Sequence, residues 1–193
     1  MPERLFTVGH SNRSWPAFLD VLREASIQTV VDVRRYPQSR RHPHFCQDAI
    51  VQALGKAGIG YRHMPDLGGY RDDTLRTSNS INEGWPEGFL RNYADYALTQ
   101  EFRTALDGLL GSLVPYSAIM CAERDWRSCH RQIIGDYAIA RGHEVAHIGG
   151  SHRLEPGTLT RFAAVRSDGT IMYGSDQPYF PFAFDRARRG KGE

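Results

Sequence analysis

Residues 117–142 constrain the fold of this chain more than any other stretch. They read SAIMCAERDWRSCHRQIIGDYAIARG and begin with the apolar run 118–120, which has no polar alternation. Such a run predicts a strand covered on both faces, as the strands of parallel sheets are. The apolar residues between Ile133 and Ala138 recur at helical spacing, and Ser128 is suited to cap that helix. We therefore expect a buried strand, a charged turn and a helix.

The turn between that strand and that helix is rich in reactive side chains. Open α/β sheets bind ligands at the carboxyl ends of their strands, and the free N–H groups at a helix amino terminus attract anions. The turn is therefore a candidate site. Its polar residues are Cys121, Glu123, Arg124, Asp125, Arg127, Cys129, His130 and Arg131.

The remaining strands follow from apolar runs near Leu5, Val30, Ile59 and Val145. A helical stretch separates each from the next strand and is long enough for a crossover, which predicts parallel pairing. With the strand at Ala118, this gives an α/β domain with a mainly parallel five-stranded sheet flanked by helices. The arrangement is Rossmann-like, with an incomplete barrel as the alternative, because a full barrel needs roughly 250 residues.

Length and composition favour one soluble domain. The chain has 193 residues, 40% of them hydrophobic, which suits a single core spanning residues 1–193. The net charge of +2 is mild, so any basic surface must come from local clustering. Three cysteines without a secretory leader predict a reducing cytoplasm, and no run approaches the roughly 20 apolar residues of a membrane span. The pattern weakens beyond residue 149, with short elements expected at 159–165 and 170–173 and a disordered tail at 186–193.

Two polar segments should meet at the same edge of the sheet as the charged turn. The first is GHSNRS after the first strand, in which Ser14 can cap the following helix. The second is VRRYPQSRRHPHF at residues 33–45, which mixes arginines with Tyr36 and Phe45. It can be a solvated basic loop, but its position favours contact with an anion or a nucleic acid, because arginine binds phosphate bidentately and aromatic rings stack on bases. The phosphate-binding candidates are His10, Ser11, Asn12, Arg13, Arg34, Arg40, Arg41 and Arg131.

The ordered set of motifs resembles the domain of unknown function family numbered 488. These motifs are GHSNRS, VDVR followed by SRR, GIGYRHMPDLGG, YADY, MCAE and CHR, and the resemblance spans about residues 5–148. Residues 149–193 are then an extension. The resemblance implies a compact α/β domain of bacterial and archaeal cytoplasmic proteins, without an established activity. The shared polar positions that it implies are His10, Ser11, Asn12, Arg13, Asp32, Arg34, Cys121, Glu123, Cys129, His130 and Arg131.

The first hypothesis for function is an enzyme, a hydrolase or transferase, acting on a phosphate-bearing substrate such as a nucleotide or nucleic acid. Arginines and His10 would hold the phosphate, while Asp32 or Glu123, with His130, would act as general base or acid. Each carboxylate also has a structural alternative: Asp32 can pair with Arg13, and Glu123 can cap the helix or pair with Arg131. We place Arg34 and Arg131 at a surface edge, where replacement by alanine should weaken ligand binding without unfolding the chain.

Three alternatives remain open. Cys121 and Arg127 have the spacing of a rhodanese-like or thiol-phosphatase-like loop, although Glu123 and Asp125 put carboxylates where such a loop binds an anion. The second alternative is a non-catalytic nucleic-acid-binding module carried by residues 34–44. The third is a zinc or iron site, for which the weak candidate ligands are Cys121, Cys129 and His130, with His10 as a further ligand type.

Overall fold

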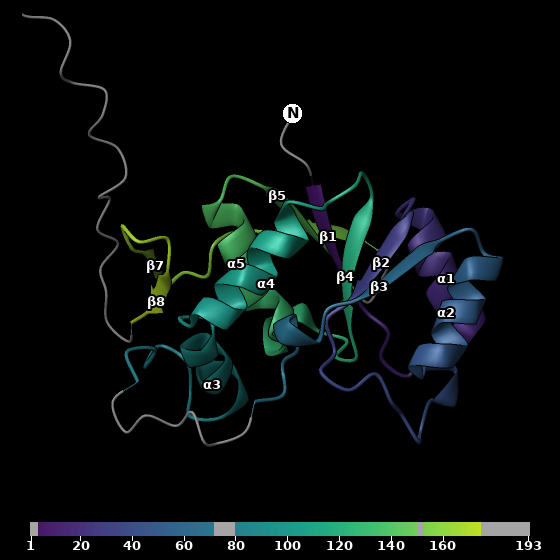
Figure 1. Cartoon of the computed structure of the whole chain (residues 1–193), viewed down its shortest axis with the longest axis horizontal. Coiled ribbons are helices and arrows are strands. Elements are labelled where there is room, and N and C mark those ends of the chain that lie inside the picture. The colour runs from purple at the N-terminus through teal and green to yellow at the C-terminus, as the bar shows by residue number, and fades with distance from the viewer. Residues whose placement is uncertain (1–3, 72–79, 150–152, 175–193) are drawn as a thin grey trace, which may run out of the picture.

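The computed structural model describes residues 4–71, 80–149 and 153–174, and its centre is an open six-stranded sheet (Figure 1). The strand order is β3-β2-β4-β1-β5-β6, with five mutually parallel strands and β6 antiparallel to β5. The strands are β1 Arg4–Gly9, β2 Thr29–Asp32, β3 Gly60–His63, β4 Ser117–Cys121, β5 Glu144–Ile148 and β6 Leu154–Pro156. The five expected strands are confirmed in a Rossmann-like sheet rather than an incomplete barrel, and β6 was not predicted.

Helices cover both faces of the sheet. Helices α1 and α2 pack on one face, and α4 and α5 pack on the other with α3 beside them (Figure 1). Their bounds are α1 Trp15–Glu24, α2 Gln47–Lys56, α3 Phe89–Tyr96, α4 Gln100–Leu110 and α5 Arg131–Ala140. Short 3₁₀ turns are η1 Pro43–Phe45, η2 Pro65–Leu67 and η4 Trp126–Ser128. This two-sided arrangement is what right-handed crossovers produce when the chain first moves toward one sheet edge and then returns.

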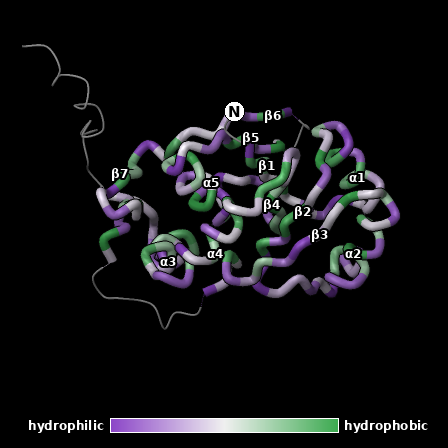
Figure 2. Tube along the Cα trace, turned by 45° about the horizontal axis from the view of Figure 1, so that its top comes forward, coloured by the Kyte–Doolittle hydropathy of each residue, from purple (hydrophilic) through white to green (hydrophobic). Residues whose placement is uncertain are grey.

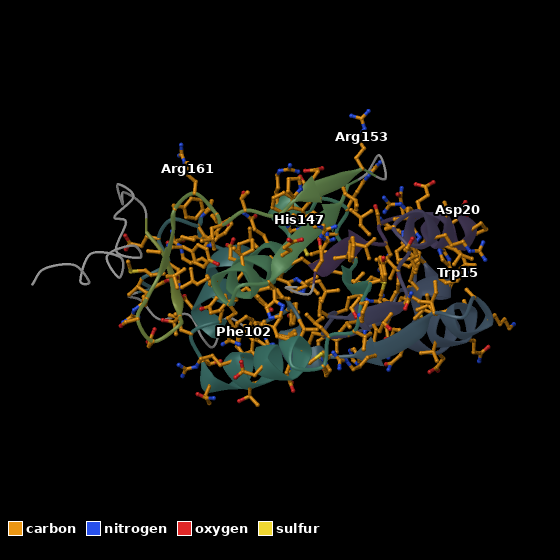
Figure 3. The ribbon with its side chains drawn as sticks, turned by 90° about the horizontal axis from the view of Figure 1, so that it is seen from above. Trp15, Asp20, Phe102, His147, Arg153 and Arg161 are labelled. Carbon is orange, nitrogen blue, oxygen red and sulfur yellow. The ribbon has the colours of Figure 1, made fainter. Side chains whose placement is uncertain are left out.

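The strand sequences are apolar on both faces because both faces are buried. In β1, Leu5 belongs to the hydrophobic cluster under α4 and α5, whereas Phe6 and Val8 belong to the cluster under α1 and α2. The tube in Figure 2 shows the hydrophobic residues along the central strands. Polar side chains such as Arg153 and Arg161 project outward in Figure 3.

The helix starts were predicted unevenly. Ser14 caps α1 as expected, because its side chain accepts a hydrogen bond from the Ala17 N–H. The prediction that Ser128 caps α5 is wrong. The first residue of α5 is Arg131, and its N-cap position is His130. Ser128 is instead the last residue of the turn η4, whose start is capped by the Asp125 side chain.

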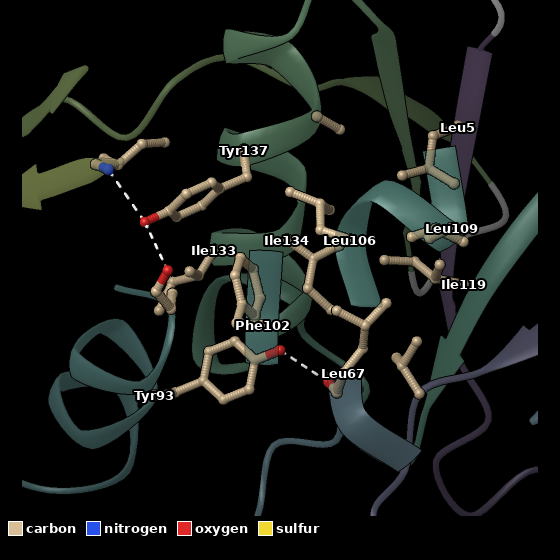
Figure 4. Close-up of a cluster of buried hydrophobic side chains, with 14 of the residues drawn as sticks. Leu5, Leu67, Tyr93, Phe102, Leu106, Leu109, Ile119, Ile133, Ile134 and Tyr137 are labelled. Atoms are coloured by element: carbon tan, nitrogen blue, oxygen red, sulfur yellow. Dashed lines mark hydrogen bonds between the residues drawn. The ribbon is translucent and has the colours of Figure 1, made fainter. Parts of the chain in front are cut away.

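Buried tyrosines tie the elements of the larger core together (Figure 4). The Tyr93 hydroxyl donates to the Leu67 carbonyl oxygen at 2.7 Å. The Tyr137 hydroxyl donates to the Ala97 carbonyl oxygen at 3.1 Å and accepts from the Ile171 N–H at 3.0 Å. Since a buried hydroxyl without a partner is destabilising, these bonds set the positions of η2, α3 and the C-terminal hairpin around α5.

The described residues after β5, 153–174, form part of the same packed body. The short elements expected there are a hairpin of β7 Ala163–Val165 and β8 Ile171–Tyr173. Asp136 in α5 holds this hairpin by accepting bonds from the Thr160 N–H, the Thr160 hydroxyl and the Tyr173 hydroxyl. Burial raises the pKa of Asp136 to about 6. The tail at 186–193 lies outside the described residues, and within those residues no helix has the length and apolar character needed to cross a membrane.

His147 in β5 gives the fold a testable dependence on pH. The side chain is buried, its Nδ1 lies 2.8 Å from the Thr7 hydroxyl, and its ring stacks on Trp126 at 3.8 Å. Burial, followed by the positive charge of Arg131, lowers its pKa to about 4. The unfolded chain protonates this histidine below about pH 6.5, whereas the folded chain leaves it neutral. Stability is therefore lost as pH falls from about 6.5 toward 4.

We expect His147→Asn to reduce this acid sensitivity. Asparagine places a polar atom near the position of Nδ1 and so keeps the bond to Thr7, but it does not titrate. Between pH 7.5 and pH 5 the wild type should lose about 2 kcal/mol of unfolding free energy through His147. Urea unfolding at both pH values measures the loss. Asp136 stabilises both proteins as pH falls in this range, so the measurement compares how steeply the unfolding free energy of each protein changes with pH. Equal slopes for the wild type and the variant would contradict the prediction.

Candidate functional site

A cavity of about 670 Å³ lies at the carboxyl edge of the sheet, beyond the ends of β1 to β4. In Figure 1 this edge is the end of β1 away from the label N. The chain leaves β1 and β2 toward helices on one face and leaves β4 toward a helix on the other, which is the arrangement that opens a crevice in doubly wound sheets. The cavity-lining residues are His10, Ser11, Arg34, Arg35, Tyr36, Gln38, Ser39, Arg41, His42, Gly69, Tyr70, Phe89, Cys121, Ala122, Glu123, Arg124 and His130.

The turn after β1 is pressed against the turn after β4. A Cβ atom on Gly9 would lie 1.9 Å from the Glu123 carbonyl oxygen, so only glycine fits at this position. The next N–H groups bond across the gap, and the Ser11 N–H reaches the Ala122 carbonyl oxygen at 2.9 Å. Ser11 has a φ of 53°, a left-handed conformation that non-glycine residues seldom adopt. Main-chain contact therefore sets the shape of this side of the cavity.

Arg34 is held rigidly by Asp32. Its Nε donates to Asp32 Oδ1 at 2.9 Å and its Nη2 donates to Oδ2 at 2.6 Å, a bidentate pair. The Tyr61 hydroxyl also donates to Oδ2, at 2.8 Å. Burial opposes ionisation of Arg34, but the bonds to Asp32 outweigh it and raise the pKa of the guanidinium. Both carboxylate oxygens of Asp32 are thus occupied, and the side chain is fully buried behind Arg34.

His10 completes the support of Arg34 and is neutral. Its Nε2 lies 3.2 Å from Arg34 Nη1 and its Nδ1 lies 2.9 Å from the Ser11 carbonyl oxygen. Because arginine only donates, Nε2 accepts and Nδ1 carries the proton. Burial and the charge of Arg34 lower the pKa of His10 to about 4. Its ring stacks on Phe45 at 4.1 Å. At neutral pH this side chain orients Arg34 and adds no positive charge to the cavity.

Two thiols and an imidazole meet at the other side of the cavity. The His130 Nε2–H donates to the Val33 carbonyl oxygen at 3.0 Å, which directs Nδ1 toward the sulfur atoms. Nδ1 lies 3.5 Å from Cys129 Sγ and 3.9 Å from Cys121 Sγ. Arg131 donates from Nε to Cys129 Sγ at 3.2 Å. All three cysteines of the chain are free, and two of them belong to this cluster.

The two thiols differ in acidity. The hydrogen bond to Cys129, followed by burial, raises the pKa of Cys121 well above its usual value. Burial also opposes ionisation of Cys129, but the bond from Cys121 and the nearby side chains of His130 and Arg131 outweigh it, so the pKa of Cys129 is well below its usual value. Cys129, the sulfur that Arg131 contacts, is therefore the more acidic of the two thiols.

The glycine pair after η2 serves close approach within the protein. A Cβ atom on Gly68 would lie 2.6 Å from the main chain of Arg35, and one on Gly69 would lie 2.3 Å from His130 Nδ1. The backbone at this point passes directly over the imidazole and the start of the basic loop. Larger residues at these two positions would displace the His130 imidazole and the start of the basic loop, so the glycines are needed for this close packing.

The cavity gathers many, but not all, of the residues that the sequence singled out. Those that line it are His10, Ser11, Arg34, Tyr36, Arg41, Cys121, Glu123, Arg124 and His130. Asp32, Cys129 and Arg131 are buried behind the lining. Arg13 donates to the Gly9 carbonyl oxygen, Asn12 is exposed outside the lining, and Arg40 lines a separate depression with residues 46–48.

Several expectations about partners are wrong. Asp32 pairs with Arg34 rather than with Arg13. Arg131 bonds the main-chain oxygen of Glu123 at 2.5 Å, and the Glu123 side chain neither pairs with it nor caps α5. Arg34 and Arg131 are 7% and 0% exposed, so they are not surface-edge residues. Arg131 is buried because the turns after β1 and β4 lie close together and enclose the start of α5.

Sequence reasoning also missed contributors to the site. Tyr61 had no signal in the sequence, because the pairing of β3 with β2 that brings its hydroxyl to Asp32 is a tertiary contact. Asp32 and Arg34 are two residues apart in extended chain, a spacing that puts both side chains on one side and predicts their pairing. Phe89 had no such signal, because it reaches the cavity from the start of α3, far from the other lining residues in sequence.

Replacement of Arg131 should destabilise the fold strongly. Arg131→Ala removes the bonds to Cys129 and Glu123 and empties the volume of a fully buried side chain. We expect a loss of about 3–5 kcal/mol in unfolding free energy, measured by urea denaturation. Arg124→Ala is the matched control, because Arg124 is exposed and should change stability by less than about 0.5 kcal/mol. Equal losses in the two variants would contradict the structural role of Arg131.

Comparison with known proteins places the chain in a family. The comparisons with curated proteins and with solved structures gave no significant match. The model of the family described as "Domain of unknown function DUF488" matches residues 14–138, which include the basic loop, the thiol cluster and most of α5. The match covers more than half of the 193 residues and agrees with the motif resemblance in the sequence. The chain belongs to the DUF488 family of domains of unknown function.

Proposed function

We propose that this protein is an enzyme that acts on a phosphate-bearing substrate, a nucleotide or a nucleic acid, in the cavity at the carboxyl edge of the sheet. The observation that carries the proposal is the charge balance of the lining. Four arginines line the cavity against one carboxylate, that of Glu123. Asp32 compensates Arg34, and Asp66 pairs with Arg35 at 3.3 Å. Arg41 and Arg124 have no ion-pair partner among the described residues, so they are available to a phosphate.

Exposed aromatic rings favour a substrate with a base. Tyr36 and Tyr70 are 67% and 61% exposed, and their ring centroids lie 6.1 Å apart at the cavity rim. Aromatic side chains this exposed next to arginines suit base stacking, which contributes about 1–3 kcal/mol per base. A sugar phosphate or inorganic phosphate would leave these rings unused.

Glu123 is the group we assign to proton transfer. It is exposed and lines the cavity. Asp32 has both oxygens occupied, so its role is to position Arg34. His130 has Nε2 bonded to a carbonyl oxygen and Nδ1 directed at sulfur. A carboxylate beside a bound phosphate can accept the proton of an attacking water or hydroxyl, which is the chemistry of a hydrolase or a transferase.

The thiol-nucleophile alternative receives less support. The raised pKa of Cys121 disfavours the thiolate that such chemistry needs. Arg127, the arginine of the Cys-x₅-Arg spacing, bonds Glu155 at 2.5 Å and Asp125 at 3.3 Å, and it does not line the cavity. The alternative of a non-catalytic binding module would use the same basic surface as the enzyme. Only a measurement of turnover distinguishes the two hypotheses.

The phosphate role of the unpaired arginines can be tested with a matched control. We expect Arg41→Ala and Arg124→Ala each to weaken binding of a short single-stranded oligonucleotide roughly 10-fold or more, because a charge-assisted bond contributes about 1.5–3 kcal/mol. Arg40→Ala should change affinity less than about twofold, since Arg40 faces a separate depression. Fluorescence titration at two salt concentrations measures the affinities. An equal loss in all three variants would show nonspecific charge attraction and count against the cavity.

Catalysis is tested by a screen of nucleotides and of single- and double-stranded nucleic acids, followed by Glu123→Gln. Loss of the proton-transfer group should lower turnover by roughly 10²–10⁴-fold, whereas binding by the same variant should persist. Thermal melts establish that the variant is folded. Wild-type protein that binds these compounds through Arg41 and Arg124 but converts none of them would support the binding module instead.

A further inference from the structure

We propose that Cys121, Cys129 and His130 form a zinc site whose fourth coordination position opens into the cavity. The proposal goes beyond the phosphate chemistry above and rests on different residues. Two thiols and an imidazole nitrogen are ligands that zinc prefers, and magnesium or calcium would select oxygen donors instead.

The spacing of the donor atoms fits one tetrahedral ion. The three ligand atoms lie within 4.8 Å of one another, with His130 Nδ1 at 3.5 Å from Cys129 Sγ and 3.9 Å from Cys121 Sγ. Zinc bonds of about 2.3 Å to sulfur and 2.0–2.1 Å to nitrogen place a sulfur and a nitrogen donor roughly 3.5–3.6 Å apart, and two sulfur donors about 3.8 Å apart. The two N···S distances need shifts of a few tenths of an ångström, and the two sulfur atoms, which lie within 4.8 Å of each other, would approach by up to about 1 Å through rotation of the Cys121 side chain.

The surrounding hydrogen bonds are those that support a metal ligand. The His130 Nε2–H donates to the Val33 carbonyl oxygen at 3.0 Å, which fixes the tautomer and leaves the Nδ1 lone pair directed at the centre of the cluster. Metal-bound histidines almost always donate their second ring N–H in this way. Arg131 donates from Nε to Cys129 Sγ at 3.2 Å, so it would hold a coordinated thiolate in position.

Burial places the open position on the cavity side. Cys121, Cys129 and His130 are 7%, 0% and 2% exposed, and the first and third of them line the cavity. Three protein ligands with one open position is the arrangement of catalytic rather than structural zinc sites. An ion here would lie at the cavity floor, where it could polarise a phosphate oxygen or a water molecule.

The test uses full-length protein produced without a histidine tag and kept reduced by a non-chelating phosphine. Elemental analysis after incubation with zinc and removal of the excess should give one zinc per chain. Cobalt substitution should give the absorption bands of a tetrahedral thiolate site. Cys121→Ser and Cys129→Ser should each weaken zinc binding by at least roughly 10–100-fold, which is the loss seen when only a hydrogen-bond partner of a metal ligand is removed. Competition with a chromophoric chelator measures the affinities.

Cys46→Ser is the matched control. Cys46 is the third free cysteine and lines a different depression, so this variant should still bind one zinc with wild-type affinity. In wild-type protein alone, one bound ion per chain and the thiolate-to-cobalt charge-transfer band test the proposal even if a cluster variant fails to fold. Wild-type protein that binds neither zinc nor cobalt stoichiometrically, or equal zinc loss in Cys46→Ser, would overturn the site. The oligonucleotide titrations of Arg41 and Arg124 are separate measurements, so each proposal can fail alone.

Discussion

The buried guanidinium of Arg131 is the interaction on which the rest of the site depends. It joins the thiol of Cys129 to the main-chain oxygen of Glu123 and lies against the end of β1 at Gly9. A fully buried cation is costly without partners, so its bonds hold the start of α5 in place against the β4 turn. The bonds of Arg131 therefore also fix the positions of the His130 imidazole and the exposed Glu123 carboxylate.

Arginines at this edge therefore divide into two classes with different physical roles. Arg34 and Arg131 are buried, with bonds to a carboxylate, a carbonyl oxygen and a sulfur, and they shape the cavity. Arg41 and Arg124 are exposed and unpaired within the described part of the chain, and they carry the charge that a ligand would meet. A count of basic residues does not separate the classes, since both occur in the same short motifs. Burial and hydrogen-bond partners do separate them.

The sequence supported the larger features of the fold and fewer of its details. The unbroken apolar runs and helical crossovers predicted the five parallel strands, and the parallel arrangement brought His10, Arg34 and Glu123 to one edge. The sequence did not predict the late start of α5, because a capping residue gives only local information. It did not predict strand β6 either, because a pattern of three residues is too short to indicate which strand it pairs with. The burial of Arg131 was missed because it results from Gly9 meeting a carbonyl oxygen more than a hundred residues away.

The proposed zinc site and the proposed phosphate site are chemically compatible because a neutral zinc site does not cancel the positive charge at the cavity wall. A zinc ion with two thiolates is neutral, so its presence would leave the excess positive charge of Arg41 and Arg124 unchanged. A phosphate held by those arginines would bring its oxygens toward the cavity floor, where Cys121 and His130 lie. Glu123, from the same turn as Cys121, would then face the substrate beside the ion. A cavity with soft ligands at its floor and free cations at its wall suits an anionic substrate that also coordinates a metal.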